Sequence, residues 1–293
     1  MPLLPNEPRL IDKTLQQALT DQFLMPAVGE LMALLVGLRE ELNTELRQLR
    51  PVKQGKPYPL GQCLEISQAV SKRLQQLDHM ALKPDAAQGL LALRSFISHG
   101  GSVRQVWGDL RGEYFQNALM VGGLYVDVAN DTVDPSKPPV EILPFAESQL
   151  TPISGFDHFS RVAACYWQAR LYPNHLVPAL APYFPLVSVT TDGLVQFQSA
   201  CNYMIALTET ASFYPSETVL ERGAMDSNLF NLMSDHLAAF ANLLAADPIV
   251  GKIAASAMCV SYRDQGVTAS EQQRDNAVRT VLQLNAQLAR FRV

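Results

Sequence analysis

Apolar residues between positions 10 and 49 recur every three or four residues, the spacing that places side chains on one face of a helix. Met25-Pro26 divides this stretch into two predicted helices, because proline interrupts a helix interior. The second helix carries a leucine stripe made of Leu31, Leu35, Leu38, Leu42, Leu46 and Leu49. Such a stripe either pairs two copies of the chain as a homo-oligomer or packs on the chain's own core. The core is favoured, since the run is too short for several heptads.

A second helical pattern begins at Cys63, after a segment in which Pro59 and Gly61 end the preceding structure. Its apolar positions are Leu64, Ile66, Ala69, Val70 and Leu74. Cys63 falls in the first turn, where unpaired backbone N–H groups and the positive end of the helix dipole stabilise a thiolate. The sequence therefore predicts a lowered pKa and a nucleophilic thiol at Cys63. The alternative is a small buried residue at a helix start.

The apolar spacing changes after a further predicted helix over residues 85–97 and a break at Gly100-Gly101. Three short runs follow, VRQVWGDL, EYFQNALMV and LYVDVAND, rich in Val, Tyr, Phe and Leu. Gly122 and Gly123 separate the last two runs, and glycine supplies the positive φ angles that a two-residue hairpin requires. Residues 103–130 are therefore predicted to form a small antiparallel meander.

The second half of the chain is predicted to be mainly helical. Residues 134–155 hold five prolines around the apolar VEILPF, which favours an extended segment wrapping the core over a domain linker. Asp192-Gly193 predicts a hairpin near residues 187–198. Helices are expected over residues 156–171, 201–213, 227–246, 248–262 and 270–291. We expect an α+β, predominantly helical fold, with residues 1–150 and 151–293 as two regions packed into a single compact unit.

Composition narrows the classes of function. A hydrophobic content of 48% with 17% charged residues excludes a disordered chain. The net charge of -5, without a Lys/Arg cluster interleaved with aromatics, argues against nucleic acid as a partner. The N-terminal MPLLPNEPRLIDK lacks a secretory pattern, and the apolar runs are interrupted short of a membrane span. We therefore expect a cytoplasmic protein without a membrane, although signal-independent secretion would leave the same sequence.

The order of cysteine helix, helix and meander carries a family resemblance. Gly61-Gln62-Cys63 and the strand LYVDVAND resemble the core of transglutaminase-like and arylamine N-acetyltransferase enzymes, members of the papain-like superfamily. In that family a cysteine at a helix start faces a histidine on one strand and an aspartate on the next. The resemblance, which covers residues 58–131, implies Cys63 as nucleophile and Asp127 as orienting carboxylate.

This chain departs from the family pattern at the histidine. Counting back from the Gly122-Gly123 turn puts Gln116 at that position, with Asn117 beside it. An amide forms hydrogen bonds but does not take a proton at neutral pH. Gln116 or Asn117 would then serve as a substitute triad member or as an oxyanion donor. His99, at a helix end next to two glycines, is the best substitute base; its alternative role is to oppose that helix's dipole.

The remaining polar residues suggest neither a metal nor a cofactor. Asp127, Asp131 and Asp134 lack the glycine and closing glutamate of a calcium loop. The Asp157-His158 and Asp235-His236 pairs lack the Glu-x-x-His spacing of a metal site in a helical bundle. The glycine-rich stretches have no P-loop lysine. Cys165, Cys201 and Cys259 lie in apolar helical patterns and are expected in the core, without zinc.

Three hypotheses follow. The leading one is a cysteine-dependent acyl-transfer or amide-hydrolysing enzyme acting on a small-molecule or peptide substrate. The second is a non-catalytic protein that uses the same core to bind a small molecule or a protein partner, which Gln116 favours. The third is an unrelated helical protein in which Cys63 only packs, and it predicts that no sheet lies beside the cysteine helix.

Overall fold

The computed structural model describes residues 2–53, 55–78, 82–266 and 271–293. The chain divides into two compact units, one over Asn6–Pro152 and the other over Met1–Pro5 with Ile153–Val293. The first unit is called the sheet unit below, and the other is called the second unit. The α+β and predominantly helical fold is confirmed.

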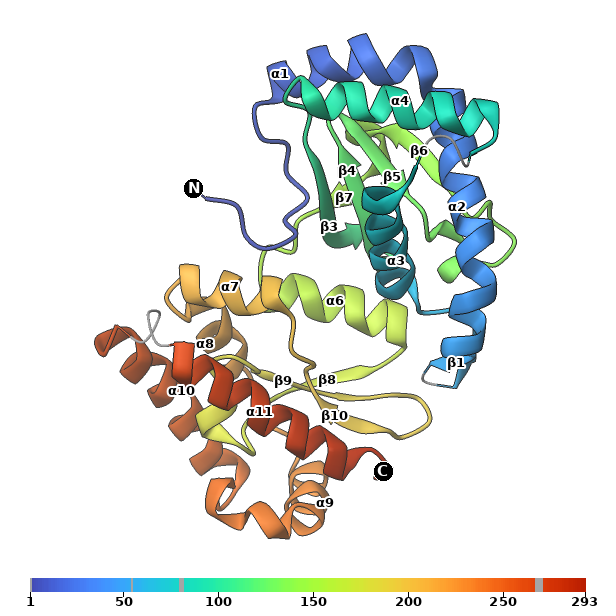
Figure 1. Cartoon of the computed structure of the whole chain (residues 1–293). Helices are drawn as coiled ribbons and strands as arrows, with labels where there is room; N and C mark the ends of the chain where they lie inside the picture. Colours follow the sequence, from blue (N-terminus) through green and yellow to red (C-terminus); the bar gives the residue numbers. More distant parts are fainter. Residues whose placement is uncertain (1, 54, 79–81, 267–270) are drawn as a thin grey trace. The chain divides into compact units, whose positions relative to one another are not determined.

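The sheet unit is built on an antiparallel five-stranded sheet of order β6-β5-β4-β3-β7 (Figure 1). Its strands are β3 (Val103–Leu110), β4 (Tyr114–Val121), β5 (Leu124–Asp127), β6 (Glu141–Pro144) and β7 (Leu150–Thr151). The three central strands confirm the predicted meander. Val121 pairs with Leu124, so Gly122 and Gly123 form the predicted two-residue turn, with φ 56° at Gly122. The proline-rich segment supplies both edge strands, β6 and β7, with the short helix α5 (Phe145–Ser148) between them.

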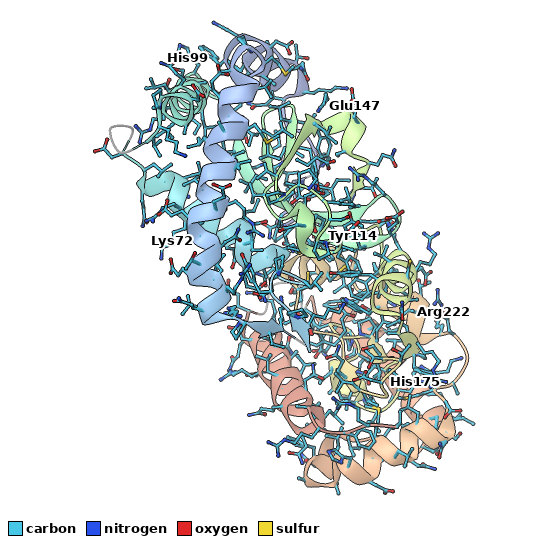
Figure 2. All side chains as sticks on the ribbon, turned by 90° about the vertical axis from the view of Figure 1, so that its right-hand side faces the viewer. Lys72, His99, Tyr114, Glu147, His175 and Arg222 are labelled. Carbon is cyan, nitrogen blue, oxygen red and sulfur yellow. The ribbon has the colours of Figure 1, made fainter. Side chains whose placement is uncertain are left out.

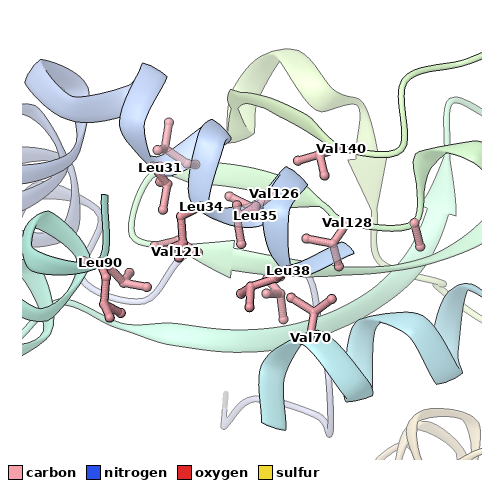
Figure 3. Close-up of a cluster of buried hydrophobic side chains, with 14 of the residues drawn as sticks. Leu31, Leu34, Leu35, Leu38, Val70, Leu90, Val121, Val126, Val128 and Val140 are labelled. Atoms are coloured by element: carbon pink, nitrogen blue, oxygen red, sulfur yellow. The ribbon is translucent and has the colours of Figure 1, made fainter. Parts of the chain in front are cut away.

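Helices cover one face of this sheet. They are α1 (Lys13–Leu19), the π turn η1 (Thr20–Leu24), the 3-10 turn η2 (Met25–Ala27), α2 (Val28–Leu49), α3 (Cys63–Gln76) and α4 (Pro84–Ser98). The interruption at Met25-Pro26 confirms the predicted break. Leucines of α2, Val70 of α3 and Leu90 of α4 pack with Val121 and Val126 of the sheet (Figure 3). Of the leucine stripe, all members except Leu49 are buried in this core, so the stripe packs within its own unit.

The α1–α2 stretch has a second property. Among the described residues, one stretch, Lys13–Leu49, is long and apolar enough to cross a membrane by length and composition. The core helix of a soluble protein passes the same test. Here Leu31, Leu35 and Leu38 lie in the core of the sheet unit, at most 2% exposed.

The sheet unit also contains a small hairpin of β1 (Val52–Lys53) and β2 (Lys56–Pro57) and the 3-10 turn η4 (Asn130–Thr132). All other elements that the structure describes belong to the second unit. In the second unit a three-stranded sheet has the order β10-β9-β8. Its elements are α6 (Phe156–Trp167), β8 (Arg170–Pro173), η5 (Pro178–Leu180), β9 (Leu186–Val189), β10 (Val195–Phe197), α7 (Asn202–Thr210), α8 (Tyr214–Leu220), α9 (Ser227–His236), η6 (Ala238–Leu243), α10 (Pro248–Asp264) and α11 (Glu271–Leu288).

Sequence patterns located most of these elements but misplaced some ends. The hairpin predicted near residues 187–198 is confirmed as β9 and β10, with Gly193 at φ 80°. The helix predicted over residues 156–171 ends at Trp167, because Gln168 turns to φ 50° and the chain continues into β8. The helix α8 lies between the helices predicted over residues 201–213 and 227–246, and Pro215 is in its first turn, where proline's missing N–H costs no hydrogen bond.

Candidate active site at the start of helix α3

Cys63 is the first residue of α3, and its side chain meets strand β4. The Asn117 side chain donates a hydrogen bond from Nδ2 to the Cys63 Sγ over 3.4 Å. One turn further along α3, Ser67 Oγ donates to the Asn117 carbonyl oxygen over 3.0 Å. The Cys63 side chain is buried, with the residue 8% exposed. The start of α3 is therefore held on β4 through Asn117, and a sheet does lie beside the cysteine helix.

The environment of the thiol opposes ionisation. Burial is the main effect and raises the pKa of Cys63; hydrogen bonds from the Asn117 side chain and backbone oppose this, and the negative charge of Asp127 adds to it. The sequence predicted a lowered pKa from the helix terminus, and that prediction is wrong. The helix start is inside the core, so the loss of hydration outweighs the favourable backbone N–H groups.

Asp127 is the centre of a buried polar network. Its carboxylate accepts hydrogen bonds from Gln116 Nε2 over 2.6 Å, from the Tyr125 hydroxyl over 2.9 Å and from the Ala129 backbone N–H over 2.8 Å. Gln116 Nε2 also donates to the Ala129 carbonyl oxygen over 3.2 Å. Burial raises the pKa of Asp127 to about 6, although the three donors act in the opposite direction. The structure therefore brings Gln116 to Asp127, but neither side chain forms a hydrogen bond with Cys63.

The strand geometry explains this separation. Successive side chains of a strand point to opposite faces of the sheet. Gln116 and Asn117 are neighbours in β4, so when Asn117 points to Cys63, Gln116 points away from it. Continuing the pairing of Leu119 with Val126 places Val128 opposite Asn117. Val128 is fully buried and apolar. If the residue at position 117 were the member of a triad that faces Cys63, the carboxylate of that triad would be expected at position 128. That position is a valine, one residue beyond Asp127.

His99 is remote from this site. It follows α4, where its Nδ1 lies 2.8 Å from the Ser95 carbonyl oxygen and its ring packs 4.5 Å from the Phe23 ring. Figure 2 labels it at the opposite end of the sheet unit from Tyr114, the first residue of β4. The chain just after His99 reaches the sheet at Ser102, whose carbonyl accepts from Gly122.

Gly122 lies five residues beyond Asn117, which is about 16 Å along a strand. His99 therefore cannot serve as the base for Cys63. The C-terminal position on α4 agrees with the alternative role of opposing the helix dipole. His79, nearest to Cys63 in sequence, lies outside the described residues. Among those described, no histidine forms a hydrogen bond with Cys63.

A buried arginine fixes the surroundings of the cysteine. Arg39 of α2 is fully buried and donates to the Asp131 carboxylate through two bonds of 2.9 and 3.0 Å. It also donates to the Val128 carbonyl oxygen over 3.1 Å and to the Tyr58 hydroxyl over 3.1 Å. Arg39 thereby joins α2, the loop before Cys63 and the chain after β5. Sequence reasoning missed it, although an arginine four residues after Leu35 on an apolar face signals a buried, paired charge.

The other candidate groups are dispersed. Cys259 is buried, with burial raising its pKa to about 12, and Cys201 is partly buried. Cys165 is exposed, so its predicted place in the core is wrong; it lies on the outer face of α6. Within the described ranges, no group of three or more His, Cys, Asp or Glu side chains could hold a metal ion.

Comparison with known proteins adds no relative. No family model, no curated protein and no solved structure matches this chain. The relation to transglutaminase-like enzymes therefore stays a prediction from residues 58–131. What the Cys63 region can do has to be inferred from its own geometry.

Proposed function

We propose that this protein is non-catalytic and uses a transglutaminase-like core as a scaffold to bind a small molecule or a protein partner. The deciding observation is the partner of Cys63. The thiol faces the amide of Asn117, and extending the pairing of β4 with β5 by two residues places the apolar Val128, and not a carboxylate, opposite Asn117. An amide cannot accept the thiol proton at neutral pH, so within the described part of the chain the thiol has no general base of the kind that a cysteine nucleophile requires.

Burial of the thiol supports the same function. A nucleophilic sulfur has to be ionised and accessible to its substrate. Cys63 is 8% exposed, and the low hydration of its sulfur raises its pKa. Both properties are those of a cysteine that packs.

The surrounding hydrogen bonds are also those of a rigid scaffold. Arg39 satisfies a carboxylate, a carbonyl and a hydroxyl from separate segments. Asp127 accepts from three donors. The buried Gln116 Oε1 has no hydrogen-bond partner among the described residues, but the charged groups of both networks are paired, and such pairing favours one arrangement of the core, which suits a scaffold that presents a binding surface.

The test is the pH dependence of iodoacetamide alkylation, followed by mass spectrometry on the folded full-length chain. Cys165, which is exposed, provides the internal reference, and Cys259 is a buried control. We expect Cys63 to react more slowly than Cys165 at every pH and with an apparent pKa above the free value of about 8.5. In a concentration of urea that unfolds the chain completely, all four cysteines should react alike.

The opposite outcome would restore the enzyme hypothesis. In that outcome Cys63 would react faster than Cys165 in the folded chain, and its apparent pKa would be well below the free value. Small-molecule and peptide substrates for acyl transfer would then be screened.

A further inference from the structure

The second unit contains a cleft of about 690 Å³ between α6 and α8. Its lining includes Ser154, His158 and Arg161 on one side and Ser212, Tyr214 and Thr218 on the other. All of these residues belong to the unit that starts at Ile153. The volume is within the range of small-molecule sites, about 300–1,000 Å³.

The charges in and around this cleft do not cancel. Asp157 forms an ion pair with Arg222, and Glu217 pairs with Arg263 over 2.6 Å. Arg161, which is exposed, has no ion-pair partner among the residues that the structure describes. The uncompensated charge at the cleft is therefore positive. A guanidinium offers several N–H donors in a plane, which suits the oxygens of a carboxylate or phosphate.

The opposite wall offers an aromatic surface. Tyr214 lines the cleft and is 59% exposed, so its side chain is accessible to a ligand. The Arg263 guanidinium lies 4.2 Å from the centre of the Tyr214 ring, and its pairing with Glu217 fixes it there. A ring supported in this way is a platform on which a planar group can stack.

We propose that this cleft binds a small molecule that combines a planar ring with an oxyanion, the oxyanion on Arg161 and the ring on Tyr214. The cleft lies in a different unit from Cys63, so this proposal does not depend on whether the Cys63 thiol is inert. The two tests can fail separately, because alkylation reports on the sheet unit and ligand titration on the cleft.

The experiment is isothermal titration of the full-length chain with phenyl phosphate and with benzoate, which separate phosphate from carboxylate recognition. Inorganic phosphate and phenol each carry only one of the two features. We expect saturable binding of at least one aromatic oxyanion, and at least tenfold weaker binding of inorganic phosphate and of phenol. Absence of saturable binding by both aromatic oxyanions would overturn the inference.

Variants locate the site. Arg161→Gln should weaken binding at least tenfold by removing the charge, and Tyr214→Leu should weaken it several-fold while keeping an apolar side chain. Arg170→Gln is the matched control, because Arg170 is also an exposed arginine of this unit but is not among the residues lining the cleft. Equal effects of Arg161→Gln and Arg170→Gln would show non-specific charge attraction and contradict the site. Thermal melting of each variant confirms that it is folded.

Discussion

The Gln116 amide nitrogen lies 2.6 Å from a carboxylate oxygen of Asp127, whereas the side chain of the next residue, Asn117, points to Cys63. The two amides thus serve opposite faces of β4. Residues that sequence reasoning grouped into one catalytic site therefore form two separate pairs. A substitution at position 117 should therefore change the reactivity of the thiol, whereas one at position 116 should not.

Asn117→His is expected to activate Cys63. An imidazole in place of the Asn117 amide, which lies 3.4 Å from the sulfur, can take the thiol proton and stabilise the thiolate as an ion pair. We expect the apparent pKa of Cys63 to fall by at least about one pH unit, which raises its alkylation rate at pH 7 roughly tenfold. Iodoacetamide labelling with Cys165 as the reference measures the change.

Gln116→His is the matched control. An imidazole at position 116 would face Asp127, so Cys63 should be alkylated no faster than in the unsubstituted chain. If Gln116→His activated Cys63 and Asn117→His did not, the side chain at position 116, and not the one at position 117, would face Cys63.

Asp127 should make the sheet unit less stable as pH rises. The folded protein keeps the Asp127 proton up to a pKa of about 6, whereas the usual pKa of 3.8 applies to the unfolded chain. Between these values the folded state binds more protons, so the free energy of unfolding falls with increasing pH. At about 1.4 kcal/mol for each pH unit between the two pKa values, the loss is about 3 kcal/mol by pH 7.

The measurement is urea unfolding from pH 4 to pH 7.5, comparing the parent with Asp127→Asn, which cannot titrate. Both carry Trp167→Phe, so that fluorescence comes from Trp107 in the sheet unit, the other of the two tryptophans. The stability of the parent relative to Asp127→Asn should decline over this range. A difference that is constant or grows with pH would contradict the raised pKa.

Arg39→Ala should strongly destabilise the sheet unit. It would leave the Asp131 carboxylate, which is 16% exposed, and the Val128 carbonyl without their donor. Removing one partner of a buried ion pair costs about 3–5 kcal/mol. Arg73→Ala is the control, because Arg73 pairs with Glu41 on the surface, and its effect should be within about 0.5 kcal/mol. Urea unfolding, followed through the fluorescence of Trp107, compares the two variants. Equal losses in the free energy of unfolding would contradict the stabilising role of the Arg39 contacts.

Gly122→Ala should cost more stability than Gly112→Ala. Both glycines have positive φ, 56° and 74°, so alanine is strained at either position by about 1 kcal/mol. At Gly122 the added methyl group would also overlap the Thr20 hydroxyl, which accepts a hydrogen bond from Gly123, and the Phe96 ring. At Gly112 it meets open space. The overlap at Gly122 should cost about 1–3 kcal/mol of stability beyond the backbone strain. Thermal melting should therefore show a clearly larger fall in Tm for Gly122→Ala than for Gly112→Ala.

Local patterns were sufficient to predict the main helices and the central meander of the sheet unit, but not its edge strands or the small hairpin of β1 and β2. The leucine spacing predicted α2, and the change to strand-type runs predicted the meander. Gly122-Gly123 predicted its turn, because a two-residue hairpin depends on the φ angles of those two residues alone. These features are determined by neighbours within about one turn of helix or one strand, so the sequence by itself carries them.

The chemistry of the site was decided by tertiary structure. A count that is off by one residue along a strand exchanges the two faces of the sheet, which is why Gln116 and Asp127 were assigned to Cys63. The depth of Cys63 depends on strand β4, 54 residues later in the chain, and the partner of Arg39 is 92 residues away. Burial and pairing at such separations arise only when the whole core has assembled. The sequence therefore determined where a thiol meets a helix start, and only the packing around it decided that the thiol stays protonated.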